Sequence, residues 1–214
     1  MSGRSTALRA AGVAVAVVAV VAAYLVGRQA DSPSFPGEGS VDVGFARDMS
    51  IHHAGAVELA ELVRDRTDDP AIRRLAADVA LTQQAQIGRM RGWLDAWGVP
   101  PTRTGPVMGW MGEPVAASEM PGLASRAELD ALAASSGTEA DLQFLSLLIE
   151  HHRAGVVMAD AAVAAATEGS VRALARAIAS SQAAEIEALS AMLEERGGRV
   201  PPPATAEHAG SGHG

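Results

Sequence analysis

Apolar residues recur at every third or fourth position along several long segments of the chain, which is the spacing of amphipathic helices. In the first such segment the pattern ends near Thr67. Asp69 and Pro70 follow, which are typical of an N-cap and of the first turn of a second helix. Gly98 and Pro100 end that second helix. The pattern therefore predicts a helical hairpin with one apolar face on each helix.

The same hairpin occurs a second time, 99 residues later and without a gap. Asp42 aligns with Asp141, and the pair His52-His53 aligns with His151-His152. Further identities fall in the same register: Phe45 with Phe144, Val57 with Val156, Arg73 with Arg172, Gln83 with Gln182 and Ile87 with Ile186. Two hairpins that each carry one apolar face bury it by packing together. The repeat predicts an all-α, ferritin-like four-helix bundle with a pseudo-two-fold axis.

The remaining segments surround this bundle. An uncharged apolar run follows Arg4 and Arg9 and is just long enough, at roughly 18 residues, to span a bilayer. The basic residues before it predict a single-pass anchor in the cell membrane with the rest of the chain outside the cytoplasm. A cleaved signal peptide is the alternative. The predicted order is an anchor or signal segment (1–28), a flexible tether (29–40), the bundle (41–197) and a disordered tail (198–214). Within the bundle, repeat one (41–97) and repeat two (138–197) flank a crossover (98–137) that holds one short helix at about 125–135.

Composition removes several classes of function. The net charge of −8 gives no electrostatic basis for binding nucleic acid. The chain has no cysteine, which excludes disulfides and thiolate chemistry. No Glu-x-x-His, His-Glu-x-x-His or Gly-x-Ser-x-Gly pattern occurs, so neither di-iron nor hydrolytic catalysis has support. We therefore expect a binding or structural protein rather than an enzyme, and a homo-oligomer is compatible with the sequence.

Candidate chemistry gathers at one level of the predicted bundle. His52 and His53 lie at the edges of the apolar stripe of their helix, one turn after Met49. The other predicted members of this polar level are Gln83, Gln86, His151, His152, Gln182 and Glu185. Buried polar groups must pair or bind something. The level is therefore a transition-metal site, a hydrogen-bonded layer that only fixes packing, or a protonation switch or site for another ligand.

These residues resemble the bacterial family catalogued as domain of unknown function 305. The resemblance rests on an arrangement of Asp-x-x-Phe, Met-x-x-His-His and Gln-x-x-Glu-Ile that is given twice, with Leu148 in place of the second methionine and Gln86 in place of the first glutamate. It covers about residues 41–197. The segment from Met120 to Ser125 also resembles the family's methionine-rich link. The family implies a ferritin-like bundle, and some exported relatives bind copper through methionine and histidine. The ligands that this resemblance implies are Met49, His52, His53, His151, His152 and Met158.

The chain departs from the metal-rich pattern of the family at four positions. Leu148 and Leu123 replace methionines, Gln86 replaces a glutamate, and Arg153 follows the second histidine pair. The remaining motif residues still predict a copper-sequestering or copper-buffering protein. Its expected ligands are the two histidine pairs, Met49, Met158 and Glu185. Gln83, Gln86 and Gln182 are expected to support this site.

Overall fold

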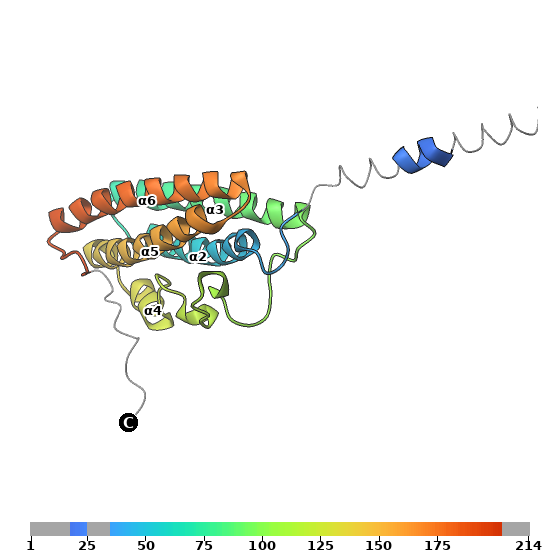
Figure 1. Ribbon diagram of the computed structural model, residues 1–214. Coiled ribbons are helices and arrows are strands. Elements are labelled where there is room, and N and C mark those ends of the chain that lie inside the picture. The colour runs from blue at the N-terminus through green and yellow to red at the C-terminus, as the bar shows by residue number, and fades with distance from the viewer. Residues whose placement is uncertain (1–17, 25–34, 203–214) are drawn as a thin grey trace, which may run out of the picture. The chain divides into compact units, whose positions relative to one another are not determined.

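The computed structural model describes residues 18–24 and 35–202, and most of these residues are helical (Figure 1). The bundle helices are α2 (Val41–Arg64), α3 (Pro70–Ala96), α5 (Gly137–Ala165) and α6 (Gly169–Glu195). The crossover contains α4 (Arg126–Ala134) and two short 3₁₀ helices, η1 (Gly109–Met111) and η2 (Ala117–Glu119). The described residues contain no β-strand, so the all-α prediction is confirmed.

The helix ends follow the capping signals of the sequence. The side chain of Asp69 accepts a hydrogen bond from the backbone N–H of Ala71, and Pro70 occupies the first turn of α3. Ser125 and Glu128 form a capping box at the start of α4. Gly197 has a φ of 79° directly after α6, which is the left-handed conformation that favours glycine at a helix end. Local chemistry therefore sets where these helices begin and end.

The helices form layers. Helix α2 packs against α3, α5 packs against α6, and the two hairpins meet through α2 and α5. Figure 1 shows α3 and α6 on one side of the α2–α5 pair and the crossover with α4 on the other. The α2–α5 pair is thus covered on both faces. It is this central pair that carries the four histidines of the repeat.

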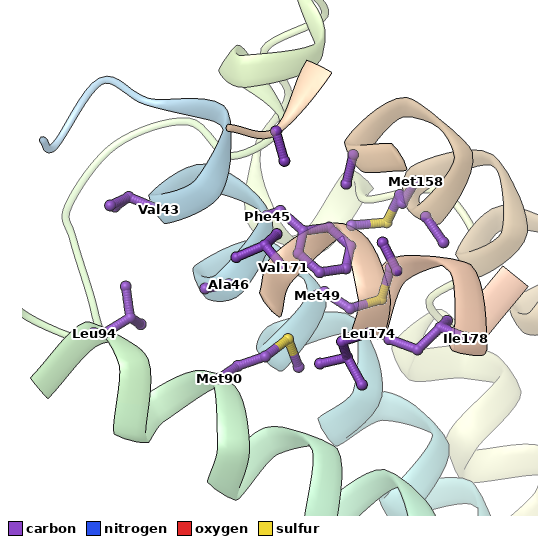
Figure 2. Packing of buried hydrophobic residues seen from close by; sticks show 14 of the residues in the cluster. Val43, Phe45, Ala46, Met49, Met90, Leu94, Met158, Val171, Leu174 and Ile178 are labelled. Carbon is purple, nitrogen blue, oxygen red and sulfur yellow. The ribbon is translucent and has the colours of Figure 1, made fainter. Parts of the chain in front are cut away.

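The buried apolar residues form two clusters. The methionine cluster contains Phe45, Met49, Met90, Met120, Met158, Val171, Leu174 and Ile178. Figure 2 shows the sulfur atoms of Met49, Met90 and Met158 within it. The leucine cluster contains Leu59, Ile72, Phe144, Leu145, Leu148, Leu189 and Leu193. On each bundle helix the polar residues of the predicted level lie between the residues of these two clusters, so a polar layer divides the core.

The first part of the crossover is anchored to α2 by a buried carboxylate. Asp48 accepts hydrogen bonds from the backbone N–H of Met108 at 2.7 Å and from Nε1 of Trp110 at 3.0 Å. Trp110 covers Gly44, where a Cβ atom would lie 2.6 Å from Cγ of the indole ring. Burial raises the pKa of Asp48 above its usual value, and the two hydrogen bonds oppose this rise. These contacts hold the crossover against the bundle near the start of α2.

The predicted membrane-spanning run falls largely outside the described residues. Residues 18–24 are helical, and within the described part of the chain no helix is both long and apolar enough to cross a membrane. The single-pass anchor with an external domain stays a prediction. Most of the predicted tail, residues 203–214, also lies outside the described residues. Its first residues contact the bundle, where Arg153 donates a hydrogen bond to the carbonyl oxygen of Pro201 at 2.7 Å.

Candidate functional site

The structure brings the two histidine pairs together in the middle of the core. Their side chains are fully buried, with an exposed fraction of 0% for each. The rings of His52 and His151 stack, with 3.8 Å between centroids and 27° between planes. His53 and His152 stand to either side, with ring centroids 6.3 Å and 6.0 Å from their chain neighbours. The two inner imidazoles, one from each repeat, thus stack on each other where the two hairpins meet.

The two outer histidines contact α3 and α6. Nε2–H of His53 donates to the Oε1 atom of Gln86 at 2.6 Å. Nε2–H of His152 donates to the Oε2 atom of Glu185 at 2.7 Å. These two acceptors occupy equivalent positions of the repeat. The pairing is therefore symmetric in geometry and asymmetric in charge, because only the second acceptor is a carboxylate.

The inner pair contacts the crossover. Nδ1–H of His151 donates to the carbonyl oxygen of Gly122 at 3.0 Å. Gly122 has a φ of 79°, and a Cβ atom there would lie 2.6 Å from Cβ of Ala154 and 3.1 Å from Nε2 of His52. The backbone can approach the two imidazoles this closely because residue 122 has no side chain. The sequence marks this segment as a link, but nothing in its pattern shows that the backbone closes over the histidines.

Each donated hydrogen bond fixes the tautomer of its ring. A neutral imidazole that donates through one nitrogen carries a lone pair on the other. The nitrogens left with a lone pair are Nδ1 of His53, Nε2 of His151 and Nδ1 of His152, and all three are buried without a hydrogen-bond partner. Neither nitrogen of His52 has a partner. The layer therefore contains several lone pairs that nothing in the described residues satisfies.

The environment keeps three of these rings, those of His52, His53 and His151, uncharged. Burial lowers the pKa of His52 well below its usual value, and the neighbouring His151 lowers it further. Burial likewise lowers the pKa of His53 to about 4 and that of His151 to about 3. These imidazoles are therefore neutral at physiological pH. Neutral imidazole is the form that binds a metal ion, so no proton would have to be removed first.

The other predicted ligands lie in different surroundings. Met49 and Met158 are buried in the methionine cluster, on one side of the polar layer (Figure 2). Glu185 lies behind His152 and accepts its N–H, in the way that an outer carboxylate orients a ligating histidine. Gln83 and Gln182 are buried, and the Oε1 atom of each has no partner. Among the described residues, no group of three or more His, Asp or Glu side chains is arranged to hold a metal ion. A site here would start from the two stacked imidazoles.

The protein is thus a helical bundle of two repeated hairpins, and each hairpin carries a buried histidine pair. The chain belongs to the family described as domain of unknown function (DUF305), which matches residues 42–193. This match confirms the resemblance that the repeated motifs indicate.

Solved structures agree with this assignment. A DUF305 protein from Streptomyces coelicolor is 46% identical, with a TM-score of 0.73, over 78% of this chain and 99% of that chain. CopM in its Cu(I)-bound form is 26% identical, with a TM-score of 0.54, over 72% of this chain and 96% of that chain. CopM has also been solved in a Cu(II)-bound form, at 25% identity and a TM-score of 0.57.

One curated protein shares a shorter segment. The uncharacterised protein L153 of Acanthamoeba polyphaga mimivirus is 35% identical over 54 residues, which are 25% of this chain and 36% of that protein. The match thus spans about a third of its length.

Proposed function

We propose that this protein is a non-enzymatic metal-binding protein that takes up copper at the histidine layer. The observation that carries the proposal is the set of unpartnered lone pairs on His53, His151 and His152. A metal-ligating histidine usually donates its other N–H to a carbonyl or carboxylate. His151 and His152 do so, to the Gly122 carbonyl and to Glu185.

The neighbouring side chains favour copper as the cargo. Imidazole suits copper among several transition metals, and thioether sulfur adds a preference for Cu(I). Met49 is one helical turn before His52, and the methionine cluster borders the layer. In this proposal His52 and His151 hold the ion first, and Met49 and Met158 supply soft sulfur ligands nearby. The copper-bound structures of CopM, a relative with the same fold, support this choice of metal.

The alternative is a layer that only fixes helix packing. A layer retained for packing is expected to have its polar atoms hydrogen-bonded, because an unpaired buried polar group costs about 1–3 kcal/mol. Here both nitrogens of His52 and the Oε1 atoms of two glutamines are unpaired. Such a layer destabilises the metal-free fold, which favours a role in binding a ligand.

Titration of the purified full chain with Cu(I), in competition with a chromogenic Cu(I) chelator, tests the proposal. The wild-type protein is expected to bind Cu(I), and the double variant His52→Leu/His151→Leu is expected to lose that binding. The matched control is His208→Ala/His213→Ala, which removes two histidines of the tail and is expected to bind as wild type does. Absence of binding by the wild type, or equal binding by the His52→Leu/His151→Leu variant, would overturn the proposal.

A single change in the layer separates binding from packing. If the layer only fixed packing, His52→Leu would lower the melting temperature. We expect His52→Leu to have a melting temperature equal to or above that of the wild type in the absence of metal, because neither ring nitrogen of His52 has a hydrogen-bond partner. Replacing an unpaired buried polar group with an apolar group of similar shape is neutral or stabilising.

A further inference from the structure

A groove lies between α3 and α6, on the face of the bundle opposite the crossover (Figure 1). We call it the α3–α6 groove and define it by its lining residues, which are Leu75, Asp78, Val79, Thr82, Gln83 and Gln86 of α3 and Ser181, Gln182 and Glu185 of α6. It exists because the hairpins meet through α2 and α5, while α3 and α6 make few direct contacts with each other. Its volume is about 240 Å³. One water molecule takes up about 30 Å³, so a cation with several waters fits.

The charged groups of the groove suit a cation. Apolar side chains, among them Leu75 and Val79, form part of its lining, and its walls also carry the carboxylates of Asp78 and Glu185 and the hydroxyls of Thr82 and Ser181. Among the described residues, no lysine or arginine lines it. The two carboxylates attract a hydrated metal cation and repel an anion.

The floor of the groove shows a second, independent sign of a ligand. Gln83 and Gln182 form this floor and are 4% and 3% exposed. The Oε1 atom of each is buried without a hydrogen-bond partner. Two amide oxygens in this state, at repeat-related positions beneath the groove, are available to a cation that passes inward from it.

The floor also reaches the stacked histidines. A Cβ atom at Gly155 would lie 2.2 Å from Oε1 of Gln182 and 3.2 Å from Cε1 of His52. Gln182 and His52 therefore approach each other across this glycine. On the groove side, Gln86 and Glu185 contact His53 and His152 directly, and Glu185 is 41% exposed. The Nε2–H groups of His53 and His152 face Gln86 and Glu185, so the lone pairs on Nδ1 lie on the far side of these two rings. Gln182 stands between the groove and the unpartnered nitrogens of His52.

The opposite face is closed by backbone. The Gly122 carbonyl contacts His151, and a Cβ atom at Gly55 would lie 2.6 Å from Cδ2 of Leu123. Entry from the crossover side requires this segment to move away, whereas the floor of the groove consists of glutamine side chains, which can change rotamer.

We propose that the α3–α6 groove is the route by which a metal cation enters and leaves the histidine layer. The groove captures the cation at Asp78 and Glu185, and Gln83 and Gln182 pass it to the imidazoles. At the two repeat-related positions that contact the outer histidines, Glu185 attracts the cation more strongly than Gln86, because Gln86 is uncharged. This inference rests on the proposed copper binding and adds a route to it.

The test compares loading rates with equilibrium binding. Cu(I) transfer from a weak chromogenic chelator to the full chain is followed by stopped-flow absorbance. The variants Thr82→Trp and Ser181→Trp fill the groove from exposed positions on its two walls. We expect each to slow loading tenfold or more, with the copper stoichiometry unchanged. The matched control is Gln84→Trp, an exposed position of α3 outside the groove, which is expected to load at the wild-type rate.

A charge variant gives a second readout that does not depend on filling the groove. Asp78→Asn is expected to slow loading severalfold at low ionic strength and to lose this effect in high salt, where charges are screened. The control Glu58→Gln removes an equal charge on the crossover face and is expected to leave the rate unchanged. If either tryptophan variant fails to fold by circular dichroism, the other variant and Asp78→Asn decide the outcome.

Wild-type loading rates in all groove variants would overturn the route. If Leu123→Ala also loaded copper faster than the wild type, while the groove variants loaded at the wild-type rate, entry would lie on the crossover side instead. Absence of copper binding by the wild type at equilibrium is a different result, and it would overturn the proposed function itself.

Discussion

Single residues in the polar layer differ in what their ring nitrogens contact, although their sequence context is repeated. His53 donates to an amide and His152 to a carboxylate, while His151 donates to a backbone carbonyl. His52 has no hydrogen-bond partner at either nitrogen. All four are fully buried. A repeated dipeptide therefore provides four chemically different imidazoles, because each ring meets a different neighbour.

The lowered histidine pKa values predict acid sensitivity of the metal-free protein. In the folded chain His53 has a pKa of about 4, against an ordinary value of 6.5. Unfolding between these two pH values takes up a proton, so the free energy of unfolding falls as the pH falls from 6.5. At pH 5 the loss from His53 amounts to roughly 2 kcal/mol.

Urea unfolding at pH 7 and pH 5 measures this effect. The variant His53→Gln has no titrating ring at this position and is expected to lose about 2 kcal/mol less than the wild type over the same interval. Equal losses in the two proteins would show that His53 has an ordinary pKa in the fold. The metal-free state must be ensured with a chelator, because a bound ion would compete with protons.

At the scale of elements, the two hairpins cap their second helices in different ways. Asp69 caps α3 with its own side chain, whereas its repeat equivalent Glu168 makes no such hydrogen bond at the start of α6. The carboxylate of Asp42, in α2, binds the backbone just before α6 instead. It accepts from the backbone N–H of Glu168 at 2.8 Å and from that of Thr167 at 3.1 Å. The first hairpin therefore stabilises the turn of the second.

This arrangement predicts a large effect for Asp42→Ala. The change removes a fully buried carboxylate and leaves the N–H groups of Thr167 and Glu168 without their acceptor. We expect the free energy of unfolding to fall by about 3 kcal/mol. The matched control is Asp141→Ala at the equivalent position, where Oδ1 has no hydrogen-bond partner, and a smaller loss is expected. Denaturant unfolding measures both, and equal losses would contradict the capping role.

At the scale of the whole molecule, the pseudo-symmetric bundle has an asymmetric core. Met49 borders the polar layer on one side, and its repeat equivalent Leu148 belongs to the leucine cluster on the other. The buried methionines of the core lie in the methionine cluster. The backbone is thus duplicated, whereas the fully buried methionines of the described residues lie on one side of the histidines, and the partly buried Met192 packs on the other side.

Reciprocal substitutions test whether this asymmetry serves copper. Met49→Leu nearly conserves volume, so we expect the free energy of unfolding to change by less than about 1.5 kcal/mol. The affinity for Cu(I) is expected to fall by roughly tenfold, the loss typical of removing a group that supports a metal site. Leu148→Met is the control and is expected to bind Cu(I) no more weakly than the wild type. Unchanged affinity in Met49→Leu would assign Met49 to packing alone.

Much of the fold follows from the chain read as a sequence, because its determinants are local or repeated. Helical periodicity places the bundle helices, and their predicted ends lie within a few residues of those observed, as with Pro70 and Gly197. The repeat then implies that the two histidine pairs meet at one level. Apolar spacing and capping act over a few residues, so a one-dimensional pattern contains them.

The contacts within the site depend on the packed structure. The Gly122 carbonyl reaches His151 across 29 positions of the chain, and Glu185 reaches His152 across 33. Which ring nitrogen each acceptor meets depends on side-chain rotamers and on the path of the crossover, and neither leaves a periodic trace in the sequence. The α3–α6 groove exists because the hairpins join through α2 and α5. The amino-acid pattern therefore determines a duplicated bundle with a histidine layer, and three-dimensional packing determines which lone pairs stay free and from which side an ion can reach them.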